Sequence, residues 1–324
     1  MWVGFSSTSL AQTATGSFRF LDVPNSARVA ALGGVNTSLT DRDINFFFNN
    51  PSLAGDTLAG VASANYRFYV ADIGQATFTY GHNFSKLGTL VFGVQHFNYG
   101  TIKSYDAAGQ EIGDFKSGET AIVIGKSHQI SNFRVGASLK GAFSNIAGYR
   151  AGALMFDIGG IFVHPTQDLR VGMTLKNLGW VFSEYSETSS TSLPFDVQLG
   201  ATFKPEHMPL RFSLTAYNLT GSNTYFNAKD GDTEPGTFDK VLRHFNFGAE
   251  ILVHKNVNLL VGYNHLIHQE LKLSESGGGA GFSFGFSAMI KTFEVVISRS
   301  AYVAGNAGHA FTVSKNIDNM MKRR

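Results

Sequence analysis

The chain has 324 residues and a formal net charge of +2, with 43% hydrophobic and only 15% charged residues, against roughly 25% charged residues in soluble domains. The small net charge points to no bulk polyanionic partner such as nucleic acid, and the absence of cysteine excludes disulfides, thiolate metal sites and cysteine nucleophiles. No run of about 20 apolar residues is present, so the sequence does not predict a helical membrane protein.

The first 56 residues lack regular alternation. Residues 1–16 are interpreted as a signal-peptide remnant or a flexible N-terminus, because Ser9-Leu10-Ala11-Gln12 is similar to a cleavage site. In residues 17–56, Pro24 and Gly33-Gly34 bracket a possible short helix. Phe46-Phe47-Phe48 then forms an apolar patch that ends at the turn signal Asn49-Asn50-Pro51.

Residues 57–316 alternate between hydrophobic and polar side chains, as strands with two different faces do. In residues 193–204, for example, Val197 and Leu199 alternate with Asp196 and Gln198. The runs approach the roughly 9–11 residues that a tilted strand needs to cross a bilayer. We therefore predict an all-β fold, a closed antiparallel transmembrane barrel of about 14 strands. The strands are expected at 57–70, 73–84, 87–103, 118–128, 131–145, 151–164, 168–177, 193–204, 209–218, 240–254, 257–268, 279–290, 292–303 and 308–316.

The connections between these strands alternate in length. Those after even-numbered strands are short, whereas most of those after odd-numbered strands are long: 104–117, 178–192, 219–239 and 269–278. Bacterial outer-membrane barrels have short periplasmic turns and longer external loops. The sequence thus predicts an integral outer-membrane protein with both termini in the periplasm, including the basic tail 317–324.

The irregular segment 17–56 is expected inside the barrel as a plug, since irregular backbone at membrane depth is tolerated only within protein. The residues that define this predicted plug are Pro24, Ser26, Ala27, Arg28, Gly33, Gly34, Asn50 and Pro51. Arg28, Asp41, Arg42 and Asp43 could pair with the wall. The candidate luminal charges of the wall could line a channel or pair inside a plugged barrel, which we favour: Arg134, Lys140, Arg170, Lys176, Arg211 and Glu250.

Three motifs carry little chemistry in this context. Gly281-Phe282-Ser283-Phe284-Gly285 matches a nucleophile elbow, but the motif requires a strand–turn–helix and here lies in an alternating strand. Asp230, Asp232 and Glu234 stand in a long external loop, which is a candidate partner-binding loop, although a cation could also bind there. His265 and His268 would face opposite sides of a strand. We therefore expect no enzyme, no cofactor and no metal site.

The N-terminal segment also resembles a known family. The stretch from Phe20-Leu21-Asp22-Val23-Pro24 to Ala31-Leu32-Gly33-Gly34, followed by Asn50-Pro51-Ser52-Leu53, resembles the signature of the PorV/PorQ group, relatives of the fatty-acid transporter FadL in Bacteroidetes. The family's usual Asn-Pro-Ala is Asn-Pro-Ser here. Tyr69-Val70-Ala71-Asp72-Ile73 and Leu87-Gly88-Thr89-Leu90-Val91-Phe92-Gly93 are similar to the PorQ branch.

The resemblance implies a component of the type IX secretion system. It implies a place in the outer-membrane attachment complex, together with the PorU sortase, PorV and PorZ. That complex removes the C-terminal signal of secreted cargo and attaches the cargo to lipopolysaccharide. The barrel would anchor PorZ in the membrane rather than catalyse a reaction. The alternative is a FadL-like transporter of hydrophobic small molecules, which needs a continuous apolar path.

Overall fold

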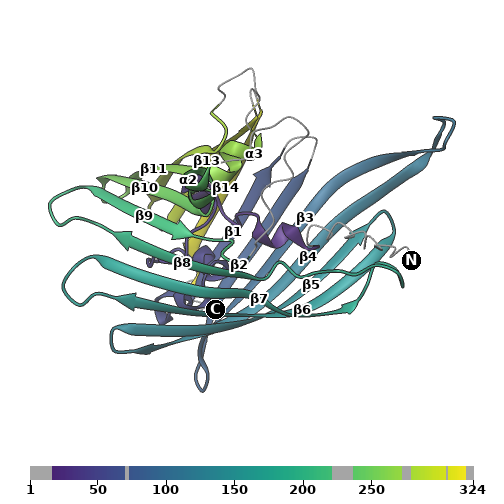
Figure 1. Cartoon of the computed structure of the whole chain (residues 1–324). Helices are drawn as coiled ribbons and strands as arrows, with labels where there is room; N and C mark the ends of the chain where they lie inside the picture. The colour runs from purple at the N-terminus through teal and green to yellow at the C-terminus, as the bar shows by residue number, and fades with distance from the viewer. Residues whose placement is uncertain (1–16, 70–72, 221–235, 272–278, 304–305, 319–324) are drawn as a thin grey trace, which may run out of the picture.

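The computed structural model describes residues 17–69, 73–220, 236–271, 279–303 and 306–318. Within them, fourteen strands form one closed antiparallel barrel, in which each strand pairs with its sequence neighbours and β1 pairs with β14 (Figure 1). The predicted fold class is therefore confirmed. The strands are β1 (Val61–Phe68), β2 (Gly74–Phe84), β3 (Gly88–Tyr105), β4 (Glu111–Ile130), β5 (Phe133–Ile146), β6 (Tyr149–Val163), β7 (Leu169–Ser183), β8 (Asp196–Phe203), β9 (Leu210–Ala216), β10 (Phe245–His254), β11 (Val257–Asn264), β12 (Phe282–Ile290), β13 (Phe293–Val303) and β14 (Asn306–Asn316).

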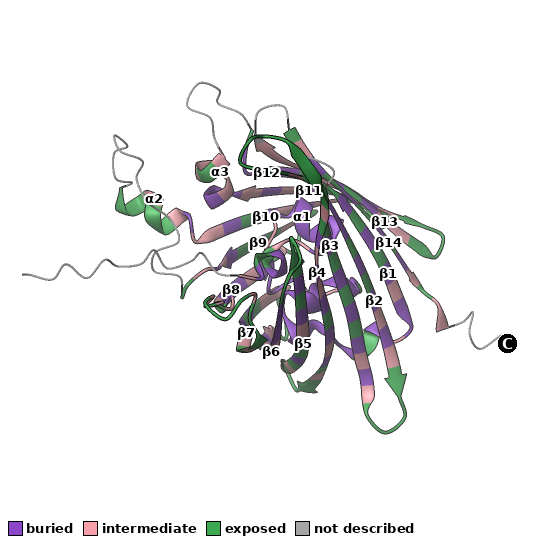
Figure 2. Cartoon of the chain, turned by 90° about the vertical axis from the view of Figure 1, so that its right-hand side faces the viewer, coloured by how far each residue is buried: buried purple, intermediate pink, exposed green. Residues whose placement is uncertain are grey.

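The two faces of the wall differ in chemistry, which Figure 2 shows as alternating colours along the strands. On β8, Asp196 and Gln198 point inward and are each 5% exposed, whereas Leu199 and Phe203 point outward and are 44% and 42% exposed. The apolar side chains of β5, β7 and β9 likewise face outward. This apolar exterior around a polar interior is the pattern of a transmembrane β-barrel.

Strand lengths differ from the prediction at the end of the barrel that carries the long connections, here called the long-loop end. β4 begins at Glu111, not 118, and β7 ends at Ser183, not 177. The β3–β4 hairpin turns at Asp106, whose carboxylate accepts hydrogen bonds from the backbone N–H groups of Ala108 and Gln110. Beyond Asn98, β3 and β4 pair only with each other, so the hairpin projects beyond the wall as a two-stranded ribbon. Unlike the strands of the wall, this ribbon does not have one apolar and one polar face.

Two helices stand at the long-loop end, α2 (Thr237–Leu242) and α3 (His265–Leu271). The predicted strand 257–268 is wrong after Asn264, because the Asn264 side chain accepts a hydrogen bond from the Ile267 N–H and begins α3. His265 and His268 therefore share a helix face, with ring centroids 6.2 Å apart. None of the described helices is long and apolar enough to cross a membrane.

Residues 17–60, here called the luminal segment, run through the barrel interior (Figures 1 and 2). The segment consists of five short turns: η1 (Arg19–Asp22), α1 (Ala27–Ala31), η2 (Ile44–Phe48), η3 (Pro51–Leu53) and η4 (Asp56–Leu58). Three of them are capped by side chains, because Ser26, Asp43 and Asn50 accept hydrogen bonds from backbone N–H groups of the first turn. Local capping thus fixes a chain that is too irregular to form a longer element.

The luminal segment passes from one end of the barrel to the other. The Ser17 N–H donates to the Ser192 carbonyl in the connection after β7, at the long-loop end. At the opposite end, the Ile317 N–H donates to the Gly60 carbonyl. The described chain thus begins at the long-loop end and finishes at the short-turn end; the termini themselves, about which we predicted a periplasmic location, lie outside the described residues.

Candidate functional site in the barrel lumen

Charged side chains join α1 to β10. The Arg28 guanidinium donates from Nε and Nη2 to Glu250 Oε1, at 3.0 and 2.7 Å, and also contacts Asp41 Oδ2 at 2.5 Å. Glu250 accepts a further hydrogen bond from Arg211 at 2.8 Å. The Arg28 and Glu250 side chains are 5% and 1% exposed, so this ion pair is buried from solvent. Although burial opposes ionisation of Asp41, the Arg28 guanidinium holds its pKa below the usual range.

The backbone of α1 and of the turn after it is also bonded to the wall. The Ala27 N–H donates to Thr312 Oγ1, and Ser283 Oγ donates to the Ala31 carbonyl, both at 2.9 Å. Asn246 Nδ2 donates to the Leu32 and Val35 carbonyls at 2.8 and 2.7 Å. Gly33 (φ 91°) and Gly34 (φ 103°) adopt the left-handed conformation that ends the helix.

The other end of the luminal segment rests on glycines of β5 and β6. Asn50 Nδ2 lies 2.8 Å from the Thr37 carbonyl and 3.3 Å from the Gly160 carbonyl of β6. A Cβ at Gly159 would overlap Asn50 Oδ1, and one at Gly136 would overlap the Pro51 carbonyl. The lack of side chains at these positions lets η3 approach the wall closely.

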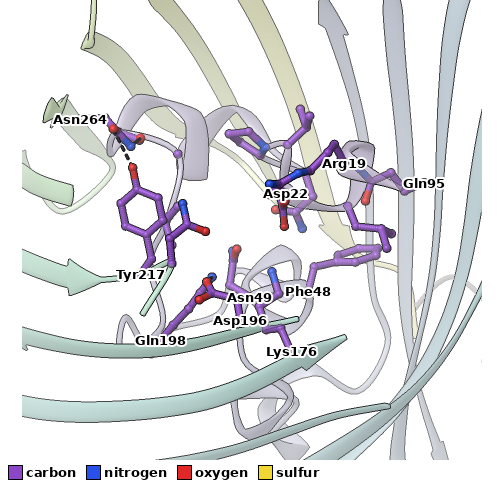
Figure 3. A pocket seen from close by; sticks show the side chains of 18 of the residues that line it. Arg19, Asp22, Phe48, Asn49, Gln95, Lys176, Asp196, Gln198, Tyr217 and Asn264 are labelled. Atoms are coloured by element: carbon purple, nitrogen blue, oxygen red, sulfur yellow. Dashed lines mark hydrogen bonds and ion pairs between the residues drawn. The ribbon is translucent and has the colours of Figure 1, made fainter. Parts of the chain in front are cut away.

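Above these contacts, towards the long-loop end, lies a cavity of about 450 Å³ (Figure 3). The luminal segment, the wall and α3 all contribute to it. Apolar lining comes from Leu21, Pro24, Val35, Phe48 and Val123, and polar lining comes from Arg19, Asp22, Asn25, Asn49, Gln95, Lys140, Lys176, Asp196, Gln198, Tyr217, Asn264 and Glu270.

Several polar groups that line this cavity lack a hydrogen-bond partner within the described residues. They are Asn49 Nδ2, Asn25 Oδ1 and Gln198 Oε1, and their residues are 7%, 4% and 5% exposed. Lys176 is 6% exposed and forms no hydrogen bond or ion pair within the described residues, although Asp22 and Asp157 are close enough to interact with it electrostatically. By contrast, Lys140 is paired, with Nζ 2.9 Å from Asp157 Oδ2 and 2.7 Å from Asn177 Oδ1. Unpartnered buried atoms also occur elsewhere in the barrel, for example at Gln75, Thr215 and Asn246, so the volume of the cavity and the position of Lys176 are what make it a candidate binding site.

The remaining predicted luminal charges lie elsewhere. Arg134 donates to Gln129 Oε1 at 2.7 Å, and Arg170 pairs with Asp168, both near the short-turn end. Of the six predicted wall charges, the structure thus joins Arg211 and Glu250 to Arg28, and places Lys140 and Lys176 at the cavity. Asp230, Asp232 and Glu234 lie outside the described residues.

The sequence analysis did not identify Asp157 and Asn177, whose contacts depend on how neighbouring strands pair. Asp157 lies on the inner face of β6, and its Oδ1 accepts from the Asn177 N–H at 2.8 Å. Asn177 (φ 59°) interrupts the β6–β7 register. A lone carboxylate on the inner face of β6, opposite Ser138 on β5, was the one available signal.

The motifs considered earlier are placed as follows. Ser283 lies on the inner face of β12, and its hydroxyl donates to Ala31 rather than to a histidine. His265 Nε2 lies 2.8 Å from Asp239 Oδ1 on α2. Although burial opposes ionisation of Asp239, the hydrogen bonds from His265 and Arg243 hold its pKa below the usual range. The described residues contain no cluster of three or more potential metal ligands.

Comparisons with known proteins find barrels of similar architecture. No protein-family model and no curated protein matches the chain. Among solved structures, the TodX monoaromatic hydrocarbon channel aligns with a TM-score of 0.47 at 12% identity, over 89% of this chain and 96% of that one. A Pseudomonas aeruginosa FadL homologue aligns with a TM-score of 0.44 at 10% identity, over 91% and 98%. The Acinetobacter baumannii outer membrane protein Omp33 aligns at 0.39 and 10% identity, over 79% and 96%.

The closed barrel, its apolar exterior and its alternating connections together define an integral outer-membrane β-barrel.

Proposed function

We propose that the chain is a non-catalytic membrane anchor whose luminal segment plugs the barrel and whose long-loop end holds a partner outside the membrane. The observation that carries this proposal is the attachment of the luminal segment to opposite sides of the wall. Ser283 on β12 donates to the Ala31 carbonyl of α1, and η3 packs against Gly136 on β5. A segment held on both sides is a poor gate, and this favours a scaffold over a wide pore.

The β3–β4 hairpin supplies a surface for such a partner. It projects beyond the wall and exposes Ile102, Tyr105 and Ile112, which are 40%, 55% and 65% exposed. Large apolar side chains on a projecting ribbon favour contact with another protein. The N-terminal resemblance to the PorV/PorQ group suggests the partner: a PorZ-like surface protein of the type IX attachment complex, acting with PorU and PorV on cargo destined for lipopolysaccharide.

The decisive experiment is purification of the tagged full-length protein from its native membrane in mild detergent. We expect a surface or secretion component to co-purify, and the double variant Tyr105→Ser/Ile112→Ser to reduce its recovery. The matched control is Leu87→Ser, because Leu87 is 55% exposed but lies in the short β2–β3 turn at the opposite end. Recovery of the wild type with no such component would count against the anchor.

A second candidate function is transport of hydrophobic small molecules, and the cavity beside the luminal segment is the observation that favours it. The test is uptake of fatty acid by liposomes that contain the purified barrel alone. Uptake by the wild type without any partner would favour transport, whereas the anchor predicts none.

A further inference from the structure

We propose that the cavity above the luminal segment is a binding site for a small hydroxylated organic acid that carries one negative charge. Its volume of about 450 Å³ falls in the range of about 300–1,000 Å³ that is typical of small-molecule pockets. Figure 3 shows Lys176, Asn49 and Gln198 grouped on one side of the cavity, with Arg19 and Asp22 across from them.

Lys176 supplies the cation of this site. It lies on the inner face of β7, is 6% exposed, and has no hydrogen-bond or ion-pair partner among the described residues. An ammonium group that is buried to this extent is normally paired, because burying a lone charge is costly. The other cations that line the cavity are already engaged, Arg19 with Asp22 and Lys140 with Asp157. Asp22 and Asp157 interact with Lys176 electrostatically without forming an ion pair with it. A carboxylate on the ligand would add the direct, charge-assisted hydrogen bond that Lys176 lacks.

The carboxylates around the cavity limit the charge of the ligand. Asp196 lies directly opposite Lys176 across the β7–β8 pair, and Asp22 lines the same cavity. Asp196 already accepts hydrogen bonds from Gln198 Nε2 and the Leu219 N–H. These carboxylates would repel a doubly charged phosphate more strongly than a monoanion, and Lys176 is the one cation lining the described part of the cavity that is not already in an ion pair. The site therefore favours a single carboxylate.

The uncharged polar groups define the rest of the ligand. Asn49 Nδ2 is a free donor that can share the ligand carboxylate with Lys176, and Gln198 Oε1 and Asn25 Oδ1 are free acceptors suited to hydroxyl groups. The terminal amide torsions of Asn and Gln are soft, so rotation turns these groups towards a ligand. For Gln198 and Asn25 this rotation would strain the hydrogen bonds that their NH₂ groups donate to Asp196 and to the Asn45 carbonyl. Phe48 and Pro24 offer an apolar surface for its carbon skeleton. A plain hydrocarbon would leave all four polar groups unsatisfied.

Access to the site is from the long-loop end. Arg19, Asp22 and Glu270 are exposed and line the cavity, whereas Lys176 lies deeper. Binding there requires no passage through the barrel, so the inference is independent of whether the protein anchors a partner or transports a solute.

The test is isothermal titration of the purified full-length barrel in detergent with gluconate, a six-carbon hydroxylated carboxylate. Two further probes separate its features: sorbitol keeps the hydroxyl groups without the charge, and hexanoate keeps the charge without the hydroxyl groups. We expect gluconate to bind with one-to-one stoichiometry and more tightly than either probe. No gluconate binding, or equal binding of sorbitol, would overturn the proposal. Tighter binding of hexanoate would indicate an apolar-acid site and would also overturn it.

Matched variants locate the site. Lys176→Met should weaken gluconate binding by about tenfold or more, because a charge-assisted hydrogen bond is lost. Arg170→Met is the control, since Arg170 is an inward-facing cation on the same strand that does not line the cavity. Asn49→Ala should weaken binding about threefold, and the Asn49 side chain makes no hydrogen bond whose loss would disturb folding. Unchanged binding in Asn49→Ala and in a folded Lys176→Met would rule the cavity out.

Discussion

The two sides of the luminal segment are held by different physical forces. On one side, α1 is fixed by the buried ions Arg28 and Glu250 and by hydrogen bonds from the wall. On the other side, η2 and η4 are fixed by an apolar cluster with β1, β3 and β4 that contains Ile44, Phe47, Leu58, Val91 and Val123. The first attachment depends on charge balance, whereas the second depends on shape.

This difference predicts how each side fails. A buried ion pair adds modest net stability, but it is costly to break because the remaining charge stays buried. The close packing of η3 against Gly136 and Gly159 is destabilised when a side chain is added there, and an apolar cluster is destabilised when buried volume is removed from it. Two substitutions and a change of pH, given from the largest expected effect to the smallest, test the buried charges and the close packing against glycine.

Arg28→Ala should have the largest effect, a destabilisation of about 3 kcal/mol, because Glu250 and Asp41 lose their most buried partner and keep only Arg211. Urea unfolding in detergent measures the loss, and planar-bilayer conductance reports whether the lumen opens. Arg19→Ala is the control, since Arg19 forms an exposed pair with Asp22, and such pairs contribute only about 0–1 kcal/mol. Equal stability of the two variants would show that the charges of α1 do not hold the segment.

Gly136→Val should have an intermediate effect of about 1–3 kcal/mol, because the new side chain would overlap the Pro51 backbone. The measurement is the midpoint of thermal unfolding in the same detergent. Gly160→Val on the adjacent strand is the matched control, since a Cβ there meets no atom within 4 Å. If both variants unfolded at the same midpoint temperature, the close packing of η3 against β5 would not contribute to stability.

A change from pH 6 to pH 8 should have the smallest effect, acting through Asp43 of the luminal segment, because only the last part of the stability linked to this group is lost in that interval. Burial, aided by the Glu294 carboxylate, raises the pKa of Asp43 to about 7 from the ordinary value of 3.8. Its neutral form is thus favoured in the folded state, so the associated stability is fully present below about pH 4 and is lost as the pH rises through 7. Unfolding at pH 6 and pH 8 measures this loss. Asp43→Asn should remove the pH dependence, and an unchanged dependence would exclude Asp43 as its source.

The wall could be read from the sequence because lipid outside and polar groups inside impose a period of two on every membrane-crossing strand. Prediction failed where that condition ends. The β3–β4 hairpin beyond Asn98 projects beyond the wall and lacks the alternation, so the predicted start of β4 at residue 118 falls after its actual start at Glu111. The end of β11 was missed because the Asn264 side chain starts a helix, a decision made by one hydrogen bond.

For the candidate site, too, the sequence predicted some features and not others. The sequence pointed to Arg28, Asp41, Arg42 and Asp43 as charges that could pair with the wall, and to Lys176 as an inward-facing cation. Of the first four, Arg42 is exposed instead. It could not show that Glu250 would pair with Arg28, because these residues are 222 positions apart. Nor could it show that Asn49 and Gln198 would stand beside Lys176 around one cavity.

The sequence by itself thus determined the barrel, the number of its strands and the faces of its wall, because each of these follows from local alternation. Only the tertiary structure decided which buried charges form ion pairs, as Lys140 does, and that Lys176 forms none with the described residues. Pairing depends on barrel closure and on the path of the luminal segment, which bring distant residues to within a few ångströms and which no local pattern records.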